Sequence, residues 1–282
     1  MGDRIIIENG KVIFDTEEGQ RYECPESRMA ELLREESTPP LEGCLLPDGV
    51  KFVDWRPPYL LVVHQYPAQV RQMRWITNDS AVPYGPGATY RPIALSLPYA
   101  ITFAMFSQTK GRLALGGSNE LYFSNQPQRT RSDRSLGYPA LLNVSHIKKG
   151  KRKLSWICTE HLAHKPNEDW TKQLDNLLHH MWGGGFNLSS EHHEGASWYG
   201  LSKGIHPDLS PVEKWEKASQ RNNLFALGVP WKPVPMTFGE LVDCFFAEHH
   251  GAGVPLRSAH TPRKPAGLIH SFLTHMNTAM KS

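Results

Sequence analysis

The first half of the chain alternates short apolar runs with turn residues, a pattern typical of β-strands. Residues 4–14 hold two β-prone runs around an Asn-Gly dipeptide, which tolerates positive φ and therefore predicts a tight hairpin. Residues 59–66 predict a buried strand, and residues 70–76 predict a second one. Pro67 lies between these two runs, so we expect a hairpin bend there.

The most hydrophobic stretch, residues 93–106, continues the series. Its β-branched and aromatic content favours strands, and Pro98 excludes one uninterrupted central strand. Two further apolar runs follow at 113–115 and 121–123, on either side of Gly116-Gly117. The pattern therefore predicts a meander of antiparallel strands.

Helical signals dominate after residue 160. Residues 166–182 place apolar side chains at helical spacing, and three glycines follow them and end the predicted helix. Ser210-Pro211-Val212-Glu213 and Thr237-Phe238-Gly239-Glu240 each read as a capping box that opens a helix. The remaining predicted helices cover residues 26–36 and 267–279. Strands followed by helices predict an α+β fold with a helical C-terminal half.

We expect three regions along the chain and find no internal repeat. The first region, 1–50, holds the N-terminal hairpin and a helix, and the second, 51–200, is the α+β core. The third, 201–282, is a helical C-terminal extension. At 282 residues, the chain is long enough for one large domain or two modest ones.

Composition narrows the functional classes. The formal net charge of +3 does not suggest general coating of nucleic acid, and the four cysteines form no CxxC pair. The N-terminus lacks an apolar signal core, and no apolar run approaches membrane-spanning length. We therefore expect a cytoplasmic protein with reduced thiols, no membrane segment and no zinc knuckle.

Positive charge is concentrated in one predicted turn. Lys148, Lys149, Lys151, Arg152 and Lys153 follow one another with a single glycine between them. One interpretation is a docking face for an acidic protein or a nucleic-acid backbone. The other is a solvated hairpin tip, which is the usual place of lysine-rich turns. Both interpretations place these side chains in solvent.

Cys158 is the candidate nucleophile. A thiolate is favoured by nearby cations or by a helix N-terminus, and the basic turn precedes Cys158 while a predicted helix follows it. Asn143 offers an amide for an oxyanion, and His161 offers a base or proton shuttle. The alternative is that Cys158 is a small buried apolar residue at a strand end. We expect no metal site, because adjacent histidines on a helix point in different directions.

The segment from Ser96 to Asn187 resembles the prokaryotic E2 families, which are related to ubiquitin-conjugating enzymes and include a protein-B family of plasmid PRTRC systems. The matching motifs are an apolar strand with a proline, a proline-bearing segment followed by a Pro-Asn-Val-like motif, the candidate cysteine, and a later tryptophan with a Phe-Asn pair. They comprise Leu97-Pro98-Tyr99, Tyr138-Pro139, Leu142-Asn143-Val144, Trp156-Ile157-Cys158, Trp170 and Phe186-Asn187. The chain departs from the pattern in having Leu141-Leu142 where the family has His-Pro.

The resemblance implies an E2-like fold, an antiparallel meander followed by helices. It implies that Cys158 accepts a ubiquitin-like C-terminus as a thioester and that Asn143 supports the oxyanion. It further implies a ubiquitin-like or E1-like partner and no cofactor. Two alternatives are a non-catalytic interaction subunit of a bacterial defence or mobile-element complex, and a cysteine hydrolase. For a hydrolase, no third member of a triad is recognisable.

Overall fold

The computed structural model describes most of the chain between residues 4 and 250. The described residues are 4–8, 10–15, 21–25, 27, 45–78, 87–109, 112–150, 152–159, 162 and 168–250. They fall into two compact units, which are treated separately below. One unit holds the described residues up to Pro127 and Gly137–Lys232, and the other holds Gln128–Leu136 and the described residues from Pro233 onward. This division differs from the predicted boundaries near residues 50 and 200.

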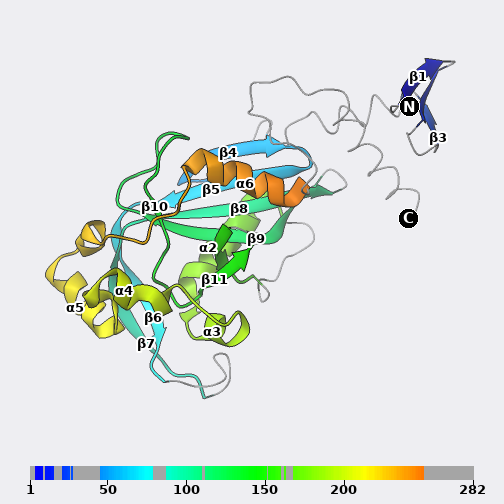
Figure 1. Cartoon of the computed structure of the whole chain (residues 1–282). Helices are drawn as coiled ribbons and strands as arrows, with labels where there is room; N and C mark the ends of the chain where they lie inside the picture. Colours follow the sequence, from blue (N-terminus) through cyan, green and yellow to red (C-terminus); the bar gives the residue numbers. More distant parts are fainter. Residues whose placement is uncertain are drawn as a thin grey trace. The chain divides into compact units, whose positions relative to one another are not determined.

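The main sheet of the first unit runs in the order β11-β12-β9-β8-β5-β4 (Figure 1). All of these neighbouring strands pair antiparallel. The strands are β4 Val50–Arg56, β5 Tyr59–Tyr66, β8 Tyr99–Thr109, β9 Arg112–Ser124, β11 Val144–Lys149 and β12 Arg152–Ile157. A short strand, β10 (Leu136–Gly137), lies at the boundary between the two units in the sequence. The predicted runs at 113–115 and 121–123 belong to one long strand, β9.

A second sheet, in the order β13-β6-β7, corrects one prediction. β6 (Gln69–Ile76) pairs with β7 (Tyr90–Leu97), and the two-residue β13 (Gly185–Phe186) joins β6 in parallel. β5 does not pair with β6, so the hairpin expected at Pro67 is wrong. β5 pairs instead with β4, which directly precedes it, and with β8, more than thirty residues later. The strand break predicted at Pro98 is confirmed, because β7 ends at Leu97 and β8 begins at Tyr99.

The N-terminal strands form a small antiparallel sheet, β1-β2-β3. β1 (Arg4–Glu8) and β2 (Lys11–Asp15) form the predicted hairpin, and Gly10 has φ of 72° in its turn. β3 (Arg21–Pro25) was not predicted. The helix expected at 26–36 lies almost entirely outside the described residues, and so does the helix expected at 267–279.

Helix α2 (Trp170–Gly183) packs against β9 and confirms the predicted apolar stripe. The buried residues of this helix are Trp170, Gln173, Leu174, Leu177, Leu178, Met181 and Trp182. The amide of Gln173 accepts from Leu115 N at 2.7 Å and donates to Leu113 O at 2.9 Å. Asp169 caps the helix by accepting from Lys172 N at 2.9 Å. One side-chain amide therefore fixes the helix against the strand.

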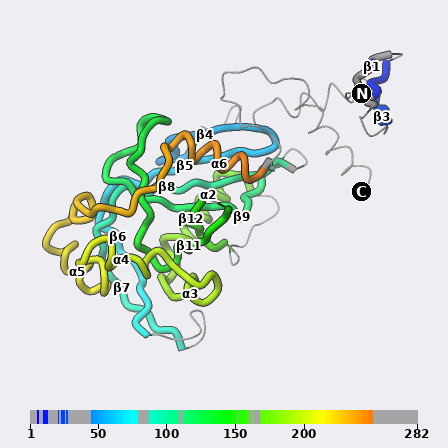
Figure 2. Tube along the Cα trace, in the orientation of Figure 1, coloured from blue at the N-terminus to red at the C-terminus, as the bar shows by residue number. Residues whose placement is uncertain are grey.

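Short helices and single turns follow α2 in the same unit (Figure 2), and they contact β7 and β11. They are α3 Ser189–His193, α4 Ser202–Ile205 and α5 Val212–Arg221, with single turns at Tyr199–Leu201, Pro207–Leu209 and Phe225–Gly228. The capping box predicted at Ser210 is wrong. Pro211 occupies the cap position with extended backbone and no side-chain cap bond, since proline carries no N–H and its side chain no acceptor. The helix is held by packing, with Trp215 Nε1 donating to Ser96 O at 3.1 Å.

The second unit contains α6 (Phe238–His250), which begins at the other predicted capping box. Thr237 N donates to Glu240 Oε2 at 2.7 Å, and Glu240 N donates to Thr237 Oγ1 at 3.1 Å. This reciprocal pair of bonds confirms the prediction. The preceding loop is joined to the helix by Arg131, whose guanidinium contacts Asp243 at 3.0 Å.

The fold is α+β with mostly antiparallel sheets, and its helices lie mainly in the C-terminal half, which confirms the predicted class. In the part of the chain that the structure describes, no helix is both long and apolar enough to cross a membrane.

Candidate functional site

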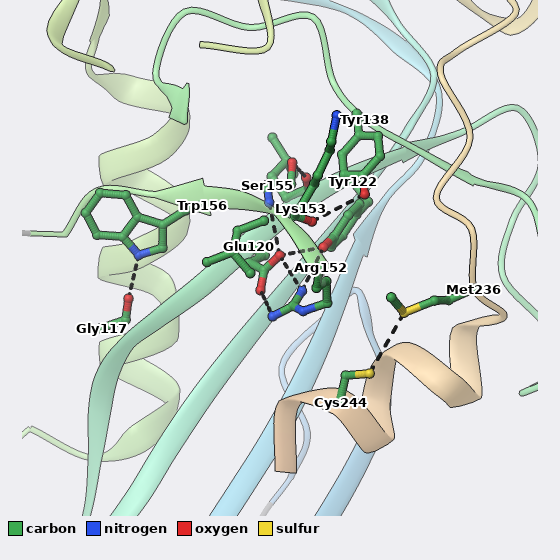
Figure 3. A network of polar contacts seen from close by, with 12 residues as sticks. Gly117, Glu120, Tyr122, Tyr138, Arg152, Lys153, Ser155, Trp156, Met236 and Cys244 are labelled. Carbon is green, nitrogen blue, oxygen red and sulfur yellow. Dashed lines mark hydrogen bonds and ion pairs between the residues drawn. The ribbon is translucent and has the colours of Figure 1, made fainter. Parts of the chain in front are cut away.

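The hairpin β11–β12 carries the predicted site residues, and a buried ion pair fixes it to β9. Arg152 makes a bidentate contact with Glu120, at 2.7 Å to Oε1 and 2.9 Å to Oε2 (Figure 3). Their side chains are 7% and 2% exposed. Ser155 N donates to Glu120 Oε2 at 3.0 Å, and the Tyr122 hydroxyl donates to the same oxygen. The desolvated carboxylate is thus paired and hydrogen-bonded, as a buried charge requires.

Two tyrosines border this ion pair. Burial, and then the negative charge of Glu120, raise the pKa of Tyr122 well above its ordinary value. The same two causes raise the pKa of Tyr138 to about 12. Both phenols therefore stay protonated near neutral pH, and the Tyr138 hydroxyl donates to Lys153 O at 3.3 Å.

The buried ion pair corrects the predicted docking face at one position. Arg152 was expected in solvent with its neighbours, but its guanidinium lies inside the protein against Glu120. Lys148, Lys149 and Lys153 are exposed, as a docking face requires. Lys151 lies outside the described residues.

Asn143 and Cys158 lie at the open end of the hairpin. The strand register pairs Val144 with Ile157, so residues 143 and 158 come next on either side of that pair. Six residue pairs and a two-residue turn separate them, which accounts for their spacing of fifteen in the sequence. The structure therefore brings the predicted thiol and the predicted amide to the same end of the hairpin.

The Asn143 side chain connects the two sheets of this unit. Its Nδ2 donates to Gly185 O at 3.0 Å, and its Oδ1 accepts from Asn187 N at 2.9 Å. β13, to which Gly185 belongs, is part of the second sheet, whereas β11 begins directly after Asn143 in the main sheet. The other amide hydrogen of Asn143 makes no hydrogen bond within the described residues. Asn143 thus has a structural role and keeps one donor for a ligand.

Cys158 is half-buried and follows β12 in the sequence. Lys153 precedes it by five positions in the sequence, which is roughly 16 Å along an extended strand. Activation of the thiol by the basic turn stays a prediction.

His180 contacts the backbone of Cys158, and sequence reasoning did not select this histidine. Its Nε2 lies 2.9 Å from Cys158 O. His180 belongs to the last turn of α2, where the helix dipole disfavours an anion. Activation by a helix N-terminus, the second source expected from the sequence, is not found in this contact. His161, the predicted base, lies outside the described residues.

Cys244 lies in the second unit, half-buried on α6, with its Sγ 3.9 Å from Met236 Sδ (Figure 3). Among the described residues, no group of three or more His, Cys, Asp or Glu side chains is arranged to hold a metal ion.

Comparisons of the chain with family models, with curated proteins and with solved structures found no match. The functional conclusion therefore depends on the residues and their geometry.

Proposed function

We propose that this chain is an E2-like protein whose Cys158 carries a ubiquitin-like modifier as a thioester. The observation that supports the proposal is the hairpin register, which brings residues 143 and 158 to the same end of β11–β12. The wide spacing of the two residues, a departure from the usual E2 pattern, then reflects only the length of the hairpin between them.

The proposed step is a thioester exchange. The Cys158 sulfur attacks the carbonyl of a modifier already linked to an E1-like cysteine, and a new S–C bond forms. The old S–C bond breaks, and the E1 thiol leaves with the proton of Cys158. The second hydrogen of the Asn143 amide supports the oxyanion during the attack, as does an amide donor in other acyl transfers. An amine then takes the acyl group, and the Cys158 thiol is regenerated.

A second candidate function is a non-catalytic E2-like interaction subunit. The bonds of Asn143 to Gly185 and Asn187 favour it, because they explain this residue without any chemistry. The contact between His180 and the Cys158 carbonyl favours it as well, since His180 lies in the last turn of α2, the end of a helix that disfavours an anion.

Exchange with a synthetic thioester tests the two functions. The purified chain is incubated with a peptide that ends in a Gly-Gly α-thioester, and the adduct is measured by intact mass before and after a reducing agent. We expect a thiol-sensitive adduct that is lost in Cys158→Ala and kept in Cys244→Ala, a matched control for a second half-buried cysteine. Equal adduct formation in both variants would remove the catalytic proposal and leave the interaction subunit.

A further inference from the structure

The face of the β11–β12 hairpin that does not hold Arg152 carries a separate group of cations. Cross-strand partners share a face of the sheet, and successive residues alternate between faces. Lys148 pairs with Lys153, and His146 pairs with Ser155 two positions further on, so these side chains lie on one face. Lys148 and Lys153 are exposed, and His146 is half-buried. Figure 3 shows Lys153 extending beside Tyr138, away from the Glu120–Arg152 pair.

Lys232, nearly eighty residues later in the chain, belongs to the same group. Its Nζ lies 5.9 Å from the centre of the Trp198 ring, and the His146 ring lies 4.2 Å from the centre of that ring. Trp198 in turn stacks on Tyr138 at 3.8 Å, and Tyr138 N donates to Lys232 O at 2.9 Å. The stacked pair of rings therefore holds the connector of Lys232 beside the hairpin.

The lysine charges of this group have no negative partner among the described residues. No described carboxylate is within ion-pair distance of Lys148, Lys153 or Lys232. Burial, and then the charges of Lys153 and Lys232, lower the pKa of His146, so the positive field extends over its ring. Cations held together without an anion favour a negatively charged ligand.

We propose that His146, Lys148, Lys153 and Lys232, which we call the basic face, bind a carboxylate-rich segment of a partner protein. The proposal adds Lys232 and His146 to the surface expected from the basic turn and excludes Arg152. It does not depend on the chemistry of Cys158, because the basic face lies along the hairpin and at its tip, whereas Cys158 lies at its open end.

Two observations favour an acidic protein over nucleic acid. The rings at this face are buried, with Tyr138 3% and Trp198 0% exposed, so neither offers a platform on which bases stack. The exposed cations of this face are three lysines. A protein that binds the nucleic-acid backbone makes roughly six to ten phosphate contacts, which is more than three lysines supply. A short run of carboxylates matches this number of charges.

Binding is expected to be linked to protonation of His146. The charged groups that act on its ring are Lys153 from β12 and Lys232 from the connector, and the uncharged ring of Trp198 packs against it. Bound carboxylates offset the two lysine charges and raise the pKa of His146. A proton is therefore taken up on binding, and the affinity increases as the pH falls from about 8 towards 6.

Fluorescence anisotropy with a labelled octaglutamate peptide at low salt tests the proposal on the full chain. We expect Lys153→Gln/Lys232→Gln to weaken binding about tenfold, which is the scale of two partly exposed ion pairs. Lys214→Gln, which removes an exposed lysine of α5, is the matched control and should bind like the unchanged chain. His146→Gln should remove the increase in affinity at lower pH.

Three outcomes would overturn the proposal. One is an equal loss of affinity in the double variant and in the Lys214 control. Another is no measurable octaglutamate binding at low salt. The third is tight binding of oligothymidylate of the same net charge in place of octaglutamate, which would assign the basic face to nucleic acid. Cys158→Ala should bind octaglutamate normally, so a failed thioester exchange and a failed docking face are distinguished.

Discussion

The two faces of the β11–β12 hairpin carry similar charges in opposite environments. On one face, Arg152 is desolvated and fully engaged by Glu120, and it fixes the hairpin to β9. On the other, Lys148 and Lys153 are exposed, with no carboxylate of the described residues within ion-pair distance. Arg152 and Lys153 are neighbours in the sequence, so the alternation of the strand places their side chains on opposite faces, and only Arg152 meets a buried carboxylate there. The comparison teaches that a run of basic residues is not one functional unit.

The largest expected effect comes from Arg152→Ala. Removing the guanidinium leaves the Glu120 carboxylate buried and unpaired, and we expect a loss of about 3–5 kcal/mol in the free energy of unfolding. Urea denaturation followed by tryptophan fluorescence measures it. The double variant Glu120→Gln/Arg152→Met removes both charges and should recover much of the loss. A loss in Arg152→Ala no larger than in Lys153→Ala would contradict the difference between the two faces.

Asn143→Ala should have the next largest effect. It leaves Asn187 N without its side-chain partner and removes one of the two side-chain donors to Gly185 O, which costs about 1–3 kcal/mol for groups shielded from water. Asn223→Ala, on an exposed side chain, is the matched control and should change stability by less than about 0.5 kcal/mol. Equal stability of the two variants would show that the amide of Asn143 does not connect the sheets.

Lys153→Ala should change the free energy of unfolding by no more than about 0.5 kcal/mol. The sign is expected to be neutral or slightly stabilising, because Lys148 and Lys153 are like charges directly opposite each other. The same urea titration measures it. A loss above about 2 kcal/mol would mean that Lys153 is engaged like Arg152.

The smallest effect concerns the titration of His146. Its pKa is lower in the folded chain, so the unfolded chain binds more protons near and below about pH 6.5, and stability decreases as the pH falls through that range. Lys153→Gln and Lys232→Gln should each raise this pKa, measured from the ring proton shifts in NMR. An unchanged pKa in both variants would place the lysines away from the ring.

Local signals in the sequence predicted local structure well. The Asn-Gly turn, the break at Pro98, the stripe of α2 and the capping box at Thr237 all depend on residues a few positions apart. The hairpin predicted at Pro67 was wrong because a proline indicates a bend in the chain and does not show which strand will pair with which. The partner of β5 on one side is β8, more than thirty residues later.

The candidate site was predictable only in part, for the same reason. The resemblance selected Asn143 and Cys158, but the contacts of Asn143 lie more than forty residues further along the chain. The sequence does contain a signal for Glu120, because a carboxylate directly before the apolar run Leu121-Tyr122-Phe123 of a strand indicates a buried cation as its partner. Lys232 left none, because only tertiary packing on Trp198 brings it to His146.

The route between β5 and β8 bears on how this fold tolerates variation in length. The chain leaves the main sheet after Tyr66 and returns at Tyr99, and Tyr66 is paired with Ala100 across neighbouring strands. The two ends of the segment between Tyr66 and Tyr99 are therefore adjacent in the main sheet. A change of length in the middle of this segment does not shift the register of β5 and β8. The connection from Ile76 to Tyr90 is therefore where we expect insertions to be tolerated best, and where a tag or reporter domain is best placed.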